Sequence, residues 1–138
     1  MKPVLVDTSF IVALYNKSDR YHSQCLNMLD AMVQPAVTCE AVVSESCYML
    51  RRMQGAASDI LATIESGALG IRFQLRSSAG KVRTLLEKYI DFPASLADAC
   101  LVQMADELDT GDILTLDSDF KRYRWRRNRA FNFLIPLD

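Results

Sequence analysis

Short runs of hydrophobic residues alternate along the chain with longer stretches in which apolar residues recur at helical spacing. The short runs predict buried strands, and the longer stretches predict helices. The predicted strands are Pro3–Val6, Ala36–Thr38, Gly70–Gln74, Asp112–Leu116 and Phe131–Ile135. The predicted helices are Ser9–Asn16, Ser23–Val33, Glu40–Arg52, Ala56–Ser66, Ala79–Lys88 and Ser95–Leu108.

This alternation is typical of an α/β domain in which helices cover both faces of a mainly parallel sheet. No repeat, linker or low-complexity segment interrupts the pattern, and 138 residues are too few for two domains of ordinary size. We therefore expect a single domain over residues 1–138.

Composition narrows the class of protein. Half of the residues are hydrophobic and 24% are charged, which is a globular balance. The apolar run Val4–Val6 is too short for a signal peptide and is broken by Asp7, and no segment is long enough to span a bilayer. We expect a cytoplasmic protein with no membrane association.

Cysteine and histidine offer little for a metal site or a nucleophilic triad. The four cysteines contain no CxxC pair, so we interpret them as reduced, buried small side chains. His22 is the only histidine and lies in a polar stretch, where a surface position is the simplest interpretation. Zinc and histidine-based catalysis are therefore disfavoured.

Two aspartates follow predicted strands. Asp7 comes directly after the first strand, and Asp117 follows the run Ile113–Leu116. In open parallel sheets, ligands bind beyond the carboxyl ends of the strands, so both residues lie at the expected functional edge. Each has an alternative structural explanation, because Asp caps helices and forms turns.

Two further acids lie on predicted helices. Asp98 shares a helix face with Leu101 and Val102, but it also fits a capping box with Ser95. Glu45 has Ala41, Val42, Tyr48 and Met49 as its helical neighbours and is therefore expected inside an apolar stripe.

An unpaired carboxylate in an apolar stripe is costly, which favours metal binding or catalysis for Glu45. The alternative is a glutamate at the rim of the core that reaches solvent or Arg52. Four clustered carboxylates would repel one another by about 1 to 4 kcal/mol for each close pair unless cations were present. Ligands that offer only oxygen select Mg²⁺ or Mn²⁺, which suit phosphodiester hydrolysis.

Four segments together resemble a known family. They are Val6–Ser9, Val42–Glu45 with Thr38 ahead of it, Leu96–Ala99 and Leu114–Phe120. In order and in spacing they resemble the PIN domain, and more particularly the toxin ribonucleases (VapC) of VapBC-type toxin–antitoxin pairs. The resemblance covers essentially the whole chain.

The resemblance implies a three-layer α/β/α domain that cleaves RNA with Mg²⁺ or Mn²⁺. It implies that Asp7, Glu45, Asp98 and Asp117 are the catalytic, metal-binding quartet of the family. It also implies that Ser9 and Thr115 are small hydroxyl residues beside the site, with Asp119 as an auxiliary acid. It further implies a homodimer and, for a type II toxin, a small antitoxin whose tail occupies the active-site groove.

A basic segment, residues 121–129, holds six of the sixteen Lys and Arg residues, together with Tyr123 and Trp125. Cations that engage phosphates and aromatic rings that stack on bases are typical of RNA contact. The residues expected to bind RNA are Lys121, Arg122, Arg124, Trp125, Arg126 and Arg127, with Tyr123 as a second ring that could stack. A solvated loop, or a surface for an acidic partner or an antitoxin, remains an alternative.

Three other functions are compatible with parts of the pattern. One is a housekeeping RNA-processing nuclease of the same fold, and another is a PIN module that binds RNA or protein without catalysis. The complete quartet argues against the second. A phosphatase or receiver domain is disfavoured because no second acid follows Asp7 at two residues and no lysine precedes Lys121 in the Leu114–Phe120 segment.

Overall fold

The computed structural model describes residues 1–137 and contains a five-stranded parallel sheet in the order β3-β2-β1-β4-β7. Its strands are β1 (Val4–Val6), β2 (Ala36–Thr38), β3 (Leu69–Ile71), β4 (Asp112–Leu114) and β7 (Asn132–Phe133). The predicted α/β class and parallel sheet are confirmed. On one side of β1 lie β2 and then β3, and on its other side lie β4 and then β7. The strand order therefore reverses between β1 and β4.

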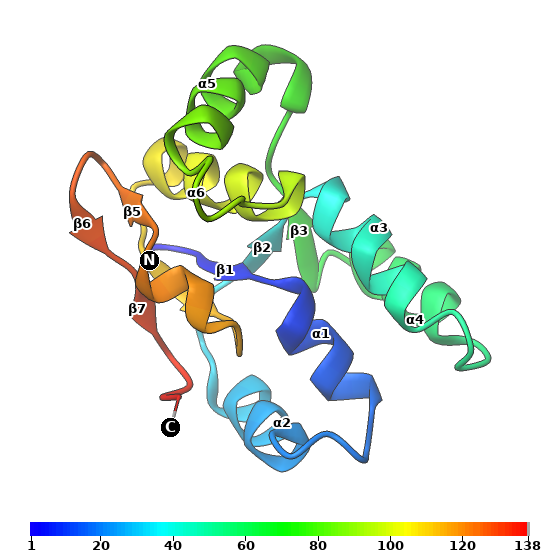
Figure 1. The fold of residues 1–138 in the computed structure, drawn as a ribbon. Helices are drawn as coiled ribbons and strands as arrows, with labels where there is room; N and C mark the ends of the chain where they lie inside the picture. The colour runs from blue at the N-terminus through cyan, green and yellow to red at the C-terminus, as the bar shows by residue number, and fades with distance from the viewer. Residues whose placement is uncertain (138) are drawn as a thin grey trace.

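Helices cover both faces of this sheet, so the domain has three layers. They are α1 (Thr8–Tyr15), α2 (His22–Ala31), α3 (Glu40–Met49), α4 (Ala56–Glu65), α5 (Leu75–Lys88) and α6 (Leu96–Leu108). Figure 1 shows α5 and α6 on one side of the sheet and α1 and α2 on the other, with α3 and α4 together at one end. Within residues 1–137, no helix combines the length and apolar character needed to cross a membrane.

The central strand β1 explains why the sheet forms around it. All three of its side chains are buried, as expected for a strand with helices on both faces. Leu5 pairs with Val37 of β2 and with Ile113 of β4, and the Asp7 amide donates to the Leu114 carbonyl at 3.0 Å. The chain therefore leaves β1 beside the end of β4, at the point where the strand order reverses, which is the usual place for a ligand site.

Several element ends differ from the prediction. Helix α5 begins at Leu75 rather than Ala79, and β4 ends at Leu114 rather than Leu116. The early start of α5 includes Ser78, whose hydroxyl donates to Glu107 of α6 at 2.7 Å. This contact between α5 and α6 depends on the packing of two helices, which the local sequence pattern does not reveal.

A short antiparallel hairpin was not predicted. It consists of β5 (Arg124–Trp125) and β6 (Arg129–Ala130), and it follows the 3-10 helix η1 (Ser118–Lys121). Its turn places Arg126 and Arg127 at positive φ (42° and 73°), a conformation that turns usually assign to Gly or Asn. The sequence therefore lacks the usual turn signal for a hairpin in this basic segment.

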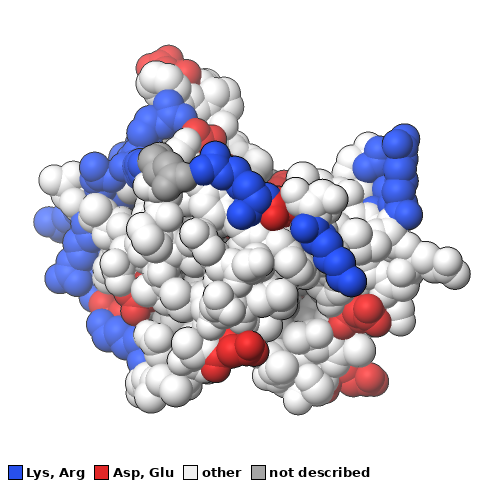
Figure 2. All heavy atoms as spheres, turned by 90° about the horizontal axis from the view of Figure 1, so that it is seen from below, with Lys and Arg blue, Asp and Glu red and all other residues white. Residues whose placement is uncertain are grey.

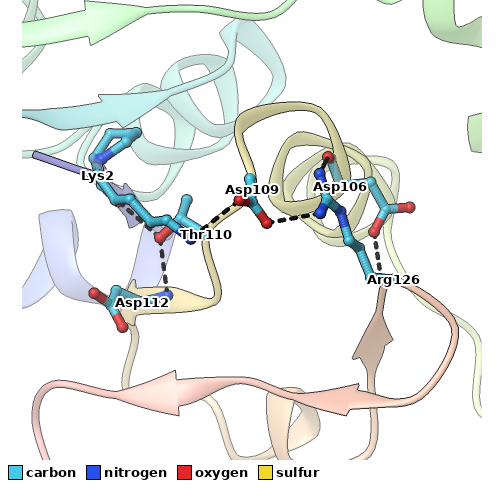
Figure 3. Close-up of polar contacts among 7 residues, drawn as sticks. Lys2, Asp106, Asp109, Thr110, Asp112 and Arg126 are labelled. Carbon is cyan, nitrogen blue, oxygen red and sulfur yellow. Dashed lines mark hydrogen bonds and ion pairs between the residues drawn. The ribbon is translucent and has the colours of Figure 1, made fainter.

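A polar network fixes the hairpin to the end of α6 (Figure 3). Asp109 accepts from Lys2 at 3.1 Å and from Arg126 at 2.8 Å, while Asp106 binds the Arg126 backbone amide. Thr110 donates to the Pro3 carbonyl at 2.9 Å. The N-terminus, the end of α6 and the hairpin are thereby held together.

Candidate active site

Asp7 lies between β1 and α1 and is only 3% exposed. Its Oδ1 accepts from the Thr8 amide at 2.8 Å, which makes it the N-cap of α1. Its Oδ2 accepts from the hydroxyl of Thr115 at 2.6 Å and from that of Ser9 at 3.2 Å. The carboxylate is therefore fixed in orientation through both oxygens.

The hydroxyls of Ser9 and Thr115 also tie the site together. They lie 3.2 Å apart, and each accepts a backbone amide from the segment after β4: Leu116 to Ser9 at 2.9 Å and Asp117 to Thr115 at 3.0 Å. These two side chains join the start of α1 to the segment that carries Asp117.

Asp98 occupies the first turn of α6 and is 9% exposed. It forms the expected capping box: its amide donates to the Ser95 hydroxyl at 3.0 Å, and the Ser95 amide donates to Asp98 Oδ2 at 3.3 Å. The same Oδ2 accepts from the buried Tyr123 hydroxyl at 3.0 Å. This tyrosine contact was not predicted from the sequence.

Asp117 caps η1 by accepting from the Asp119 amide at 2.9 Å. One carboxylate oxygen from each of Asp98, Asp117 and Asp119 lies within 4.8 Å of the other two. Asp119 also forms an ion pair with Arg122, with Nη2 and Oδ1 2.6 Å apart. Asp119, expected only as an auxiliary acid, thus belongs to this three-acid cluster.

Electrostatics connect Asp7 to this cluster. Burial raises the pKa of Asp7 from 3.8 to about 6, with further increases from the charges of Asp98 and Asp117, while the hydrogen bonds from Thr115 and Thr8 oppose the shift. Burial also raises the pKa of Asp98, and the charge of Asp117 adds to this. A cation bound beside these carboxylates would offset the repulsion between their negative charges.

Glu45 lies on α3, is partly buried and is outside the three-acid cluster. Within residues 1–137 it forms no hydrogen bond or ion pair, so the alternative partner Arg52 is not engaged. The predicted apolar stripe around it was only partly correct. Val42 is fully buried, but Tyr48 and Met49 are 65% and 54% exposed.

The basic segment divides into two parts. Lys121 and Arg122 belong to η1 or its end, next to Asp119, whereas Arg126, Arg127 and Arg129 belong to the hairpin. Arg124 is tied down locally, since its guanidinium donates to the carbonyls of Lys121 and Tyr123 at 2.8 and 2.9 Å. Figure 2 shows Lys and Arg side chains gathered along the edge where Figure 1 places the hairpin.

The expectation that Tyr123 or Trp125 stacks on bases is wrong. Tyr123 is 2% exposed and Trp125 is 7% exposed, and the Trp125 indole donates to the Ala130 carbonyl at 3.2 Å. Both rings face the core because residues alternate between the two sides of β5 and its approach. Of the six residues expected to bind RNA, Trp125 is therefore not available for stacking.

An apolar cavity of about 410 Å³ lies apart from the acids, between α1, α2 and α4. Its lining includes Phe10, Ile11, Leu26, Leu29 and Ile60. Among its lining residues only Tyr15 is titratable, so the cavity offers space for an apolar group and no acid–base chemistry.

The donor set of the acidic site fits a hard divalent cation. All of its ligand atoms are carboxylate oxygens, with hydroxyls beside them and neither sulfur nor imidazole among the clustered atoms of the described residues. Mg²⁺ and Mn²⁺ prefer such ligands. Asp98, Asp117 and Asp119 are the residues that could hold the ion, with Asp7 beside them.

Comparisons with known proteins identify the family. A model of the PIN domain matches residues 4–126. The chain is 26% identical over 136 residues to Ribonuclease VapC26 of Mycobacterium tuberculosis. The aligned region covers 97% of this chain and 93% of that protein.

The fold has a close structural counterpart as well. It is similar to the crystal structure of Mycobacterium tuberculosis VapC20, described as a sarcin–ricin loop cleaving toxin. The TM-score is 0.78 at 21% sequence identity, over 86% of this chain and 93% of that one. At this identity the likeness concerns the fold.

Proposed function

The chain belongs to the PIN domain family, and on that premise we propose that it is an endoribonuclease that hydrolyses RNA phosphodiester bonds with Mg²⁺ or Mn²⁺. One observation carries the proposal: oxygens of Asp98, Asp117 and Asp119 meet within 4.8 Å, beside the buried Asp7. The relation to Ribonuclease VapC26 supports the same activity. A cation-binding site made of carboxylates alone suits phosphoryl chemistry.

We assign the catalytic, metal-binding roles to Asp7, Glu45, Asp98 and Asp117, with Asp119 as a further ligand. A bound divalent ion supplies an activated water, orients the phosphate and neutralises charge on the leaving oxygen. Glu45 is partly buried and, among residues 1–137, engaged by no other side chain. Its carboxylate is therefore free to turn toward the substrate or the ion.

The neighbouring residues hold the carboxylates in position. Thr115 and Ser9 fix the Oδ2 of Asp7, and Tyr123 fixes the Oδ2 of Asp98. Because Asp7 is also the N-cap of α1 and Asp98 belongs to the capping box of α6, the backbone limits the motion of both side chains. A site built in this way keeps its negative charge ordered before the ion binds.

We also propose that the protein is the toxin of a type II toxin–antitoxin pair, acts as a homodimer in the cytoplasm and is inhibited by a small antitoxin. The naming of VapC26 and VapC20 supports this role. The apolar cavity between α1, α2 and α4, with Leu26 and Leu29 40% and 43% exposed, offers a place for an apolar segment of such a partner. Co-purification with the product of a neighbouring short reading frame tests this role.

The activity is tested by RNA cleavage with Mg²⁺, Mn²⁺ or EDTA. The substrates are single-stranded and structured RNAs, including a sarcin–ricin loop, the target named for VapC20. Asp98→Asn, Asp117→Asn and Glu45→Gln are each expected to lower the rate by about 100-fold or more, because they remove proposed ion ligands. Glu65→Gln, an exposed acid of α4, is the matched control and should cleave normally. Cleavage that survives EDTA, or that all three variants retain, contradicts the proposal.

A further inference from the structure

Phe92 is a large aromatic residue left exposed next to the acidic cluster. It lies in the connection between α5 and α6 and is 59% exposed. The guanidinium carbon of Arg122 lies 4.3 Å from the centre of its ring. The two side chains thus form a cation–π pair at the surface, with planar faces of the kind that RNA-binding proteins use for bases.

Arg122 joins this pair to the proposed ion ligands. Its Nη2 lies 2.6 Å from Oδ1 of Asp119, whose carboxylate belongs to the three-acid cluster. The ring of Phe92 is therefore connected to the proposed ion site through Arg122, which contacts both Phe92 and Asp119. An RNA whose phosphate reaches the cluster brings its adjacent bases close to Phe92.

The two segments that carry the pair are fixed to each other. The Phe92 amide donates to the Tyr89 carbonyl at 3.1 Å, and the Tyr89 hydroxyl accepts from the Arg124 amide at 2.9 Å. The rings of Tyr89 and Tyr123 pack edge to face at 5.0 Å. A stacking platform held in this way loses little conformational entropy when it binds a base.

The surroundings of Phe92 favour RNA over a protein partner. Lys88 and Lys121 are exposed near the pair, and Arg122 already covers the ring. Ile90 and Leu96 are exposed apolar neighbours along the chain, so a protein interface is the alternative. Cations interleaved with an aromatic ring beside a phosphate-directed acidic site are the usual composition of a single-strand RNA surface.

We propose that Phe92 and Arg122 form a subsite for an unpaired nucleotide of the RNA substrate, in which the base stacks on Phe92 and Arg122 contacts the phosphate. This inference rests on the RNA-cleaving function proposed above. The ion pair between Arg122 and Asp119 also couples the subsite to the ion. Without a cation, Asp119 neutralises Arg122; when Asp119 binds a cation, the guanidinium becomes free for phosphate.

The first test measures binding of a single-stranded RNA of about 12 nucleotides over a range of salt concentrations, in Mn²⁺ and in EDTA. It is done at low temperature, for a time over which the RNA stays intact on a denaturing gel. Phe92→Leu should weaken binding roughly tenfold without changing the salt dependence, because stacking releases no counterions. Phe92→Tyr should bind like the wild type.

Arg122→Gln should act differently. It should lower the magnitude of the slope of log K against log[salt] by about 0.7, the value for one phosphate contact on a single strand. This decrease in slope should be larger in Mn²⁺ than in EDTA. The controls are Leu61→Ala, an exposed apolar side chain of α4, and Arg83→Gln on α5. Neither control should change RNA affinity or its salt dependence.

The second test measures Mn²⁺ binding by electron paramagnetic resonance without RNA. Arg122→Gln should tighten Mn²⁺ binding several-fold, because it removes a cation that competes for Asp119. Arg83→Gln should leave the Mn²⁺ affinity unchanged. Equal Mn²⁺ affinity of the wild type and Arg122→Gln contradicts the coupling.

The outcomes separate the subsite from the enzyme activity. Cleavage that requires metal, with RNA binding unaffected by Phe92→Leu, overturns the subsite and leaves the nuclease. The predicted binding pattern without metal-dependent cleavage leaves the subsite and overturns the nuclease. If Phe92→Leu instead changes the oligomeric state in sedimentation, the patch is a protein interface and the proposal is wrong.

Discussion

At the scale of single residues, Asp7 and Asp117 are N-caps, Asp98 is the third-position partner in a capping box, and all three lie in or beside the acidic site. From the sequence alone, capping and a role in the site are alternatives for each of these acids. In Asp7 the two carboxylate oxygens are separate acceptors: Oδ1 caps α1, while Oδ2 binds Thr115, so capping does not exclude a role in the site. Spacing predicted these three acids, but it could not reveal Tyr123 as a partner of Asp98, which depends on packing across the fold.

We expect Asp7→Asn to stabilise the metal-free protein above about pH 6. The folded pKa of Asp7, about 6, is above the ordinary 3.8, so the contribution of Asp7 to stability is highest below about pH 4 and falls as the pH rises to about 6. Asparagine carries no charge and avoids this loss, which is on the order of 1 to 3 kcal/mol for a shift of about two pH units.

Urea unfolding in EDTA, at about pH 4 and about pH 7.5, measures this difference. The gain in the free energy of unfolding for Asp7→Asn should be present at the higher pH and small at the lower. Asp30→Asn, an exposed acid of α2, is the control and should show no such change. An equal effect of Asp7→Asn at both pH values would show that burial does not strain this carboxylate.

At the scale of elements, hydrophobic runs located each strand of the five-stranded sheet within a few residues, because central parallel strands are buried on both faces. The β5–β6 hairpin was missed for a physical reason. The six basic residues of the 121–129 segment dominated the interpretation, although exposed or partly exposed arginines alternate with buried Tyr123 and Trp125 in the strand period of two. That alternation was the signal that could have revealed the buried rings.

Gly111 at the start of β4 shows how tightly the hairpin packs. A Cβ at this residue would lie 2.2 Å from Nε1 of Trp125, and the indole is held by its bond to Ala130. We expect Gly111→Ala to destabilise the protein by about 1 to 3 kcal/mol, because the buried ring has to shift.

The matched substitution is Gly80→Ala in the exposed face of α5, where a Cβ would meet nothing within 4 Å. It should stabilise the protein by about 0.5 to 1 kcal/mol through helix propensity. Thermal unfolding of both variants gives the comparison. A neutral Gly111→Ala would mean that Trp125 does not pack against β4 as described.

At the scale of the whole molecule, a net charge of −1 conceals two separate regions. The acids meet at the start of α6, whereas the hairpin arginines lie at its other end, where Asp106 binds Arg126. Asp98 and Asp106 are eight residues apart, or about 12 Å along the helix. The turn of the hairpin at Arg126 therefore lies away from the acidic cluster, whereas Arg122, ahead of the hairpin, contacts it through Asp119.

If bound RNA extends from the cluster to the hairpin, Arg127 and Arg129 contact its phosphates. The double variant Arg127→Gln/Arg129→Gln should then lower the salt slope of single-strand binding by about 1.4. Arg76→Gln/Arg83→Gln on α5 is the control of equal charge. An unchanged slope for the hairpin variant would limit the RNA contact to the η1 side of the site.

Every proposed role of these carboxylates depends on their holding a divalent ion. The most direct measurement is anomalous diffraction at the manganese edge from crystals soaked in Mn²⁺. We predict a peak bonded to carboxylate oxygens of Asp98 and Asp117, with Asp119 or Asp7 completing the site, at about 2.0 to 2.3 Å. The peak should be lost in crystals of Asp117→Asn. No peak at this cluster in well-ordered crystals, or a peak that Asp117→Asn retains, would contradict the claim.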